Sequence, residues 1–250
     1  MLKYFNGYQK NFEKKLDTIL NKRKMGNSKK LPVVKKIIAD VLKNGDISVI
    51  KYEKKFNNLK ITSNKNLKFN KTEMKNIIKK LDKKIKKSID IAYNRIYRFH
   101  KKQKLTKYKI KDKYNNSCSY TVSSIKAVGV YVPGGTASYP SSVLMNCIPA
   151  KIAGVKEIYM TTPAFNKKFN PAVLYAAQKC GVKEIYKVGG VQAIAALAYG
   201  TKIIKKVNKI VGPGNEYVAL AKKEVFGDVG IDMIAGPSEV TVIADKYSNP

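Results

Sequence analysis

Four short glycine-containing turns between residues 125 and 244 carry the residue types best suited to bind a ligand. They are 132–135 (Val-Pro-Gly-Gly), 188–191 (Val-Gly-Gly-Val), 212–215 (Gly-Pro-Gly-Asn) and 235–238 (Ala-Gly-Pro-Ser). Each turn follows a β-rich run, and helical runs alternate with the β-rich ones. In a parallel α/β sheet this arrangement presents backbone N–H groups to an anionic ligand. The spacing therefore predicts a site at the carboxyl ends of the strands.

Three polar side chains lie in or beside these turns: Tyr131, Gln192 and Asn215. They could hydrogen-bond the sugar, amide or ring of a nucleotide, while the glycines would let the backbone approach its phosphates. Each helix N-terminus would add about half a unit of positive charge. The chain has neither a G-x-G-x-x-G nor a G-x-x-x-x-G-K-[ST] motif. Glycine spacing alone therefore leaves two interpretations open, a nucleotide site and ordinary tight βα turns.

The other residues that could take part in catalysis or metal binding do not form a recognisable catalytic or metal-binding set. His100 is the only histidine and ends a helical run without a nearby carboxylate or cysteine, so we expect a structural role. Cys118, Cys147 and Cys180 are too irregularly spaced for a disulfide framework or zinc cluster, which favours buried hydrophobes or a strand-side thiol. Ser238, followed by Glu239, fits a cap as well as a substrate contact. No Ser/His/Asp set or acid–base pair is recognisable.

The elements around the turns alternate between strand and helix. Four β–α units in about 110 residues predict an open, mostly parallel sheet with right-handed crossovers. We expect strands at 127–132, 157–161, 184–188, 209–211, 231–234 and 240–244. We expect helices at 141–153, interrupted or shifted by Pro149, then from Asn170-Pro171 to Gly181, at 192–199, and around 218–225.

The N-terminal half is predicted to be mainly helical. Apolar spacing indicates helices at 32–42 and 46–56, after a loosely helical tail at 1–30. Residues 70–99 read as one long amphipathic helix, capped by Asn70 with Glu73 in a capping box. The polar, alternating run 105–124 suggests a strand or hairpin.

The formal net charge of +33 raises the possibility of nucleic-acid binding. Residues 1–120 hold 35 basic and 9 acidic residues, and residues 121–250 hold 15 and 8. Only Arg23, Arg95 and Arg98 are arginines, the residue type that base and phosphate recognition favours. The lysines are spread along the chain, which favours compositional drift. We expect no nucleic-acid partner, although a polyanion site stays open as an alternative.

Taken together, the turns and their flanks resemble the histidinol dehydrogenase family. The resemblance covers nearly all of 126–245, in order and at the family's spacing. The matching stretches are 128–135, 139–145, 149–155, 176–181, 188–198, 210–215 and 231–239, with weaker echoes at 44–46, Tyr52, 55–56, 96–100 and Gln103.

The resemblance implies oxidation of L-histidinol through the aldehyde to L-histidine, in two NAD-dependent hydride transfers carried out by a zinc-dependent homodimer. By resemblance, Tyr131, Gln192 and Asn215 match positions that contact NAD. Ser238 matches a position that contacts substrate.

The family's fold implies an incomplete Rossmann-like parallel-sheet domain, inserted after the helix-rich N-terminal part of a second α/β domain. The expected divisions are an N-terminal segment at 1–27, the first part of domain 1 at 28–130, the NAD-binding domain 2 at 131–237, and the return to domain 1 at 238–250. We expect a cytoplasmic protein without a membrane partner, because no secretory core and no apolar run of about 18 residues is present.

The chain departs from the family in one important respect. The family's zinc ligands and its catalytic Glu-His pair follow the Gly-Pro-Ser-Glu turn, so we expect them beyond residue 250 and assign no catalytic or metal residue within the chain. Thr136 stands where relatives often have Lys. Three hypotheses follow: a fragment of the enzyme that is inactive alone, a truncated remnant that retains NAD binding, and a basic nucleic-acid-binding module. We favour the first.

Overall fold

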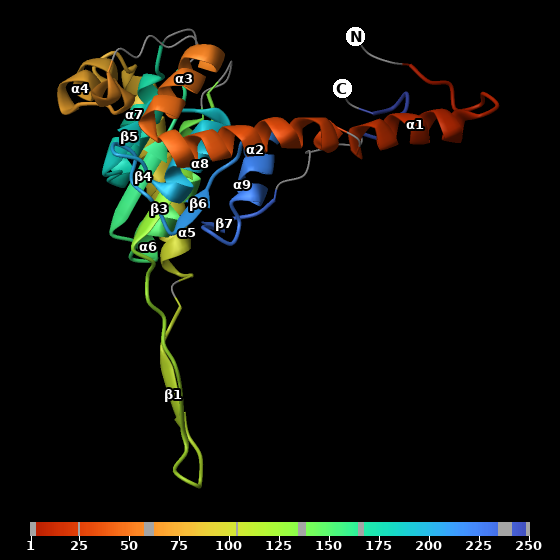
Figure 1. The fold of residues 1–250 in the computed structure, drawn as a ribbon. Coiled ribbons are helices and arrows are strands. Elements are labelled where there is room, and N and C mark those ends of the chain that lie inside the picture. The colour runs from red at the N-terminus through yellow and green to blue at the C-terminus, as the bar shows by residue number, and fades with distance from the viewer. Residues whose placement is uncertain are drawn as a thin grey trace.

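A five-stranded parallel sheet forms the centre of the computed structural model, which describes residues 4–24, 26–57, 63–103, 105–134, 139–164, 168–234 and 242–248 (Figure 1). The strands lie in the order β5-β4-β3-β6-β7, and each neighbouring pair is parallel. Their bounds are β3 Ala127–Tyr131, β4 Glu157–Thr161, β5 Glu184–Tyr186, β6 Lys209–Val211 and β7 Gly230–Ile231. The order confirms the predicted fold class.

Helices cover both faces of the sheet. α6 (Pro140–Ile152) and α7 (Pro171–Cys180) pack on one face, and α8 (Gly190–Tyr199) and α9 (Glu216–Glu224) pack on the other. Apolar side chains on both faces of the sheet explain this arrangement. In the central strand β3, successive side chains point to opposite faces. Val128 and Val130 join the core with α6 and α7, whereas Ala127 and Tyr131 join the core with α8 and α9. Both faces of the sheet are therefore buried, as parallel sheets require.

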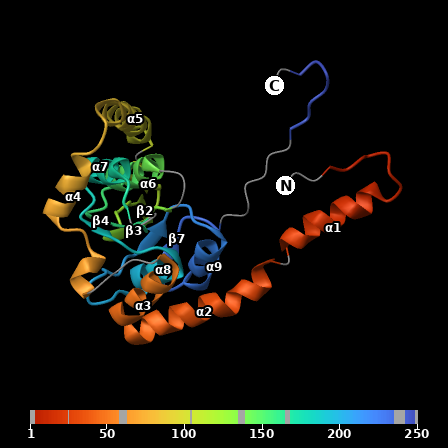
Figure 2. The ribbon, with the colours of Figure 1, turned by 90° about the horizontal axis from the view of Figure 1, so that it is seen from above.

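Two N-terminal helices form a further layer over α8 and α9. α2 (Gly26–Asn44) packs on α8 and α9, and α3 (Asp46–Asn57) packs on α8. The predicted apolar face of α2 is buried, and Gly45, at φ +54°, makes the turn between the two helices. α1 (Phe12–Lys24) and the first part of α2 extend away from the body (Figure 2). The helices expected at 32–42 and 46–56 are thus confirmed.

The single long helix expected at 70–99 is wrong. The structure has two helices, α4 (Lys71–Ile78) and α5 (Lys83–Lys101). Asp82 caps the second, because its carboxylate accepts hydrogen bonds from the backbone N–H groups of Lys84 at 2.7 Å and Ile85 at 3.1 Å. α4 packs on α7, whereas α5 packs on both α6 and α7. The apolar spacing continues across the break, so periodicity alone did not reveal it.

A two-stranded antiparallel arm projects from the body. Its strands are β1 (Tyr108–Lys111) and β2 (Ser117–Tyr120), which confirms the hairpin expected within 105–124. Every residue of both strands is exposed, and Figure 1 shows the arm standing clear of the sheet. A short 3-10 helix, η1 (Asn64–Leu67), lies between α3 and α4.

Several boundaries differ from the sequence-based expectations, and β5, for example, ends at Tyr186 rather than at 188. α6 continues through Pro149, and β7 ends at Ile231 rather than at 234. Residues 242–244 of the strand expected at 240–244 are not in a strand, and 240–241 lie outside the described residues. The division into domains stays a prediction; its boundary at 131 falls on the last residue of the central strand. Within the described residues, no helix combines the length and apolar character needed to cross a membrane.

Candidate functional site

The candidate site lies where the strand order of the sheet reverses. The chain passes from β3 outward through β4 to β5, and then returns to place β6 on the other side of β3. In open α/β sheets, ligands bind outside the carboxyl ends of the strands at such a switch point. Tyr131 ends β3, and the turn 212–215 follows β6 directly. The turn at 212–215 and the described residues 132–134 of the turn at 132–135 are therefore neighbours at this edge.

Tyr131 points from the end of β3 to the start of α8. Its phenolic oxygen accepts a hydrogen bond from the backbone N–H of Gly190 at 3.1 Å, and the residue is only 4% exposed. Burial raises the pKa of Tyr131 to about 12, an effect to which the nearby Glu53 carboxylate adds. The phenol therefore keeps its proton at neutral pH. Because the oxygen already accepts one hydrogen bond, its O–H is left to act as a donor.

Gln192 lies in the first turn of α8 and is held by an acid from a different helix. Its Nε2 donates to Oε1 of Glu53 at 2.8 Å, and the backbone N–H of Gly189 donates to the same oxygen at 2.8 Å. Asn57 donates to the other carboxylate oxygen at 2.7 Å. Burial raises the pKa of Glu53, against these hydrogen bonds, which lower it. Glu53 thus serves as the acceptor that the N-terminus of α8 requires.

Glu53 is a residue that sequence reasoning missed. It lies in a lysine-rich stretch, where an acid reads as part of a solvated helix face. A helical projection would have placed it beside Val49 and Tyr52, which are buried with it. An acid on the apolar face of a helix was therefore the available signal.

The glycines of two turns have a packing explanation. A Cβ on Gly189 would lie 2.5 Å from Cβ of Pro163, and a Cβ on Gly134 would lie 2.7 Å from Cγ of the same proline. Pro163 follows β4, so its ring sits between the turns that follow β3 and β5. The backbone N–H groups of Gly189 and Gly190 already have acceptors in Glu53 and Tyr131. In this structure, the turn at 188–191 therefore does not offer these two N–H groups to a phosphate, contrary to the expectation from glycine spacing.

The turn at 212–215 packs directly on the central strand. Gly212 has φ +114°, and a Cβ there would lie 2.1 Å from the backbone oxygen of Tyr131, so only glycine fits. The buried Lys222 of α9 pairs with Asp232 and donates to the carbonyl oxygen of Gly212 at 3.0 Å. Asp232 also accepts from the N–H of Gly212 at 2.8 Å. This network, in which Lys222 is buried and Asp232 lies at the surface, fixes the turn that carries Asn215.

Asn215 caps α9. Its Oδ1 accepts a hydrogen bond from the backbone N–H of Val218 at 3.1 Å, and the residue is exposed. The structure joins Tyr131 and Gln192 through Glu53 and the start of α8. It places Asn215 on the adjacent turn, three residues from the contact between Gly212 and Tyr131. Ser238 lies outside the described residues.

Two buried polar atoms at this edge have no hydrogen-bond partner in the structure: Oε1 of Gln192 and Oγ1 of Thr161. Thr161 ends β4, pairs in register with Tyr131, and faces α8 by strand alternation. Oε1 of Gln192 lies 3.1 Å from the position that a Cβ would take on Gly190. A buried polar atom without a partner is unfavourable, so each is a candidate contact for a bound molecule or water.

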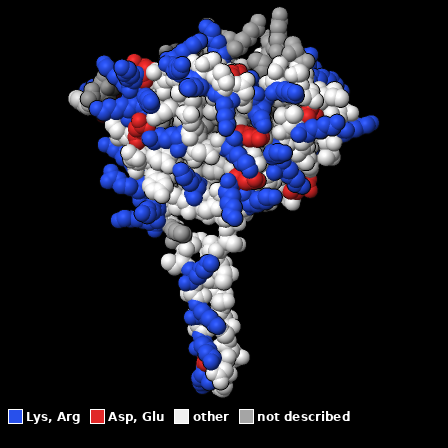
Figure 3. All heavy atoms as spheres, turned by 90° about the vertical axis from the view of Figure 1, so that its left-hand side faces the viewer, with Lys and Arg blue, Asp and Glu red and all other residues white. Residues whose placement is uncertain are grey.

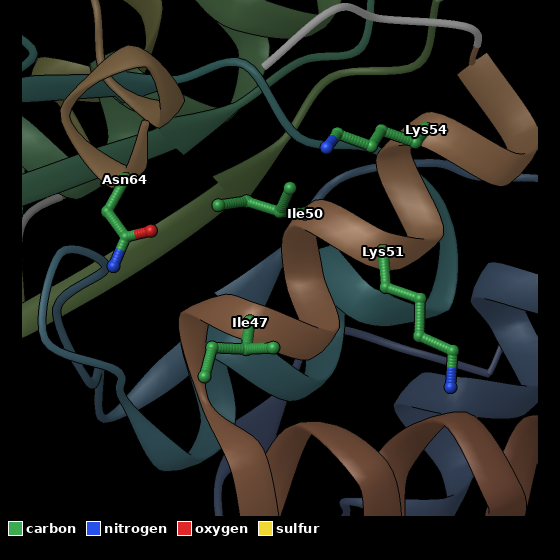
Figure 4. Close-up of a pocket in the computed structure, with 5 residues that line it drawn as sticks. All are labelled: Ile47, Ile50, Lys51, Lys54 and Asn64. Carbon is green, nitrogen blue, oxygen red and sulfur yellow. The ribbon is translucent and has the colours of Figure 1, made fainter. Parts of the chain in front are cut away.

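Two hollows lie away from this edge. One lies on the outer side of α3 and has a volume of about 440 Å³. It is lined by Ile47, Ile50, Lys51, Lys54 and Asn64. The ammonium groups of its two lysines point away from each other (Figure 4). The other, of about 630 Å³, lies between the end of α5, the base of the arm and α6, and includes His100. His100 contacts Oε1 of Gln103 through Nδ1 at 2.7 Å, a local contact that fits the expected structural role.

The cysteines and the surface charge add no catalytic set. Cys147 and Cys180 are buried and hydrogen-bond to each other, which raises the pKa of Cys147, and Cys118 is exposed on β2. Across the described part of the chain, no three His, Cys, Asp or Glu side chains gather into a possible metal site. Figure 3 shows basic side chains spread over the whole visible face, with acidic residues between them.

The chain is similar in sequence to histidinol dehydrogenases. The family model of histidinol dehydrogenase matches residues 20–250. The histidinol dehydrogenase of Pelagibacter ubique is 56% identical over 251 residues, which cover 100% of this chain and 58% of the relative. The histidinol dehydrogenase of Clostridium acetobutylicum is 46% identical over 95% of this chain and 55% of its own length. The chain therefore spans little more than half the length of these relatives.

A solved structure agrees with the sequence matches. The crystal structure of histidinol dehydrogenase from Elizabethkingia anophelis aligns with a TM-score of 0.80 and 40% identity, over 87% of this chain and 50% of its own. The alignment therefore includes most of the sheet and helices described above. On the family match over residues 20–250 and these identities, the chain belongs to the histidinol dehydrogenase family.

Proposed function

We propose that the protein to which this chain belongs oxidises L-histidinol through L-histidinaldehyde to L-histidine with NAD, the last step of histidine biosynthesis. Within it, this chain supplies the dinucleotide site. Family membership supports the reaction. The observation that carries the site is the meeting of Tyr131 and Gln192 at the start of α8, at the carboxyl edge of the sheet.

The residues at this edge fit a dinucleotide. Oε1 of Gln192 is a buried acceptor without a partner, and the phenol of Tyr131 retains a proton to donate. Asn215 is exposed at the N-terminus of α9, where its Nδ2 is available while Oδ1 caps the helix. These groups suit sugar hydroxyls or a carboxamide, which both donate and accept hydrogen bonds. When bound, NAD would accept a hydride in each of two successive oxidations.

The described residues do not fit the zinc that the family implies. They contain no cluster of three potential ligands, so they cannot by themselves form a zinc site. We assign zinc and the acid–base pair to the whole protein, outside this chain. A substrate contact of Ser238, a homodimeric assembly and a cytoplasmic location complete the proposal on the basis of the family alone.

The first experiment is calorimetric titration of this 250-residue chain with NAD, followed by an assay for histidinol-dependent formation of NADH. We expect saturable NAD binding and no NADH formation. Asn208 is a matched control for Asn215, because its Oδ1 accepts the N–H of Ala127 at the amino end of β3, remote from the site. N215A should weaken NAD binding and N208A should not. Absence of saturable binding by the unchanged chain would refute the proposed site.

A further inference from the structure

Glu53 is the one fully buried acid among the described residues, at 0% exposure, and it reaches the site from another layer of the fold. It lies on α3, while the groups it binds belong to the first turn of α8. One carboxylate oxygen accepts both the N–H of Gly189 and Nε2 of Gln192, each at 2.8 Å. The other accepts Nδ2 of Asn57 at 2.7 Å. Both carboxylate oxygens are thus engaged by groups of the protein itself.

These bonds determine which end of the Gln192 amide is available. A carboxylate only accepts hydrogen bonds, so it selects the NH₂ group and turns the carbonyl oxygen away. That oxygen is the buried atom without a partner, beside Gly190. If the amide were reversed, two oxygens would face each other and the site would lose its acceptor.

We propose that Glu53 is a positioning residue for ligand binding: it holds Gln192 so that Oε1 accepts a hydrogen bond from a sugar hydroxyl or carboxamide of the dinucleotide, and it keeps the phosphates away from α8. The inference rests on the proposed function. It goes further by naming a residue on α3 as part of the site and by stating which portion of the ligand meets α8.

The exclusion of phosphate from α8 follows from the same contacts. A helix N-terminus normally attracts an anion through free N–H groups and its dipole. Here Glu53 already occupies this position, and Tyr131 accepts the N–H of Gly190. A phosphate brought to the same place would meet a buried negative charge and N–H groups with acceptors. A neutral donor meets neither obstacle.

Variants of Glu53 separate its role in holding Gln192 from its role in keeping phosphate away from α8. E53Q keeps an oxygen for Gly189 and Gln192, and Asn57 can rotate its amide to accept from the new NH₂, so NAD affinity should stay within about threefold of the unchanged chain. E53L removes the acceptor and should weaken NAD binding at least about tenfold. E53D retains the charge but withdraws it by one methylene group, so it should also weaken binding. The readout is calorimetric titration with NAD.

A double variant tests whether Glu53 acts through Gln192. Q192L should weaken NAD binding at least about tenfold, and E53L should add less than about twofold in the Q192L background. D40N is the matched control, because Asp40 accepts from Tyr52 on the same α3 without contacting Gln192, so it should leave NAD affinity unchanged. Circular dichroism establishes that each variant is folded; if E53L does not fold, E53D gives the result.

The outcomes are distinct. If the unchanged chain does not bind NAD, the proposed function itself is wrong. If it binds NAD but E53L or E53D binds equally well, or E53L adds its full effect in the Q192L background, the positioning role is wrong. If E53Q tightens NAD binding more than about tenfold, removal of a nearby charge has helped a phosphate, and the exclusion of phosphate from α8 is wrong.

Discussion

The phenolic oxygen of Tyr131 accepts the backbone N–H of Gly190 at 3.1 Å, which ties the end of the central strand to the start of α8. Y131F removes this acceptor and leaves the half-buried N–H of Gly190 at the helix start without its partner. We expect the free energy of unfolding to fall by about 1–3 kcal/mol and NAD binding to weaken. Urea denaturation measures the first effect and calorimetric titration the second.

Y175F is the control for this prediction. Tyr175 also has a hydrogen-bonded hydroxyl, which donates to the Asp90 carboxylate, but it lies on the other face of the sheet. It should change stability without changing NAD affinity. Equal stability of Y131F and the unchanged chain would contradict the assigned hydrogen bond.

Glu53 gives a pH dependence with a defined sign. Burial raises its pKa in the folded state above the ordinary value of 4.5, so the folded protein binds this proton more tightly than the unfolded chain does. Between the two pKa values the unfolded state carries fewer protons, and stability therefore falls as pH rises through this window. E53Q has no such titration, so its stability relative to the unchanged chain should rise with pH. Denaturation over a pH series tests this.

Asp40 should behave in the opposite way. The hydrogen bond from Tyr52, opposed by burial, lowers the pKa of Asp40 below 3.8. Its contribution is therefore present above that value and is lost as pH falls through the folded-state pKa. The stability difference between the unchanged chain and D40N should shrink on acidification. A constant difference for either acid would contradict its assigned environment.

Gly189 is required by Pro163. In G189A the new methyl group would lie 2.5 Å from Cβ of the proline, so we expect a loss of about 1–3 kcal/mol from overpacking. P163A keeps Cβ but removes Cγ, which would lie 2.8 Å from the new methyl group, and frees the backbone from the ring constraint, so in the same chain it should recover part of the loss. G181A is the control, because no atom lies within 4 Å of its Cβ and only its φ of +79° is unfavourable. Thermal and urea denaturation should show rescue by P163A for G189A and none for G181A.

As the N-cap of α5, Asp82 should contribute about 1 kcal/mol to the free energy of unfolding. D82A removes the acceptor for the N–H groups of Lys84 and Ile85, so urea denaturation should show a loss of this size. D112A is a control, because Asp112 accepts from Tyr114 and Asn116 in the exposed turn of the arm. It should leave the stability of the body nearly unchanged. An unaffected D82A would indicate that the α4–α5 break does not depend on this cap.

Much of the fold was predictable because local signals agreed with packing. Asn170 before Pro171 and Gly181 in the left-handed conformation bound α7, and the buried face of α2 has the predicted 3.6-residue spacing. The break at Asp82 was missed because Ile78, Leu81 and Ile85 keep helical spacing across it. Pro149 was misjudged because it removes one i→i−4 hydrogen bond without ending α6, which continues through it to Ile152.

The site was harder to predict because it depends on contacts between distant segments. Family resemblance identified Tyr131, Gln192 and Asn215, and their role in NAD binding stays a prediction. The pairing of Gln192 with Glu53 spans 139 residues and has no local signature. Glycine spacing indicated the turns. It did not reveal that close packing requires glycine at three positions, two beside Pro163 and one beside the backbone of Tyr131.

Pro163 packs between two glycine turns at the carboxyl edge of the sheet, in contact with both. One ring separates the turns after β3 and β5, so displacement of the β4 turn must press on both neighbours at once. Evolutionary exchange of either glycine for a larger residue would consequently demand a simultaneous change at the proline. The three loops are therefore constrained to vary as a single unit, even though some 55 residues separate the outer two along the polypeptide.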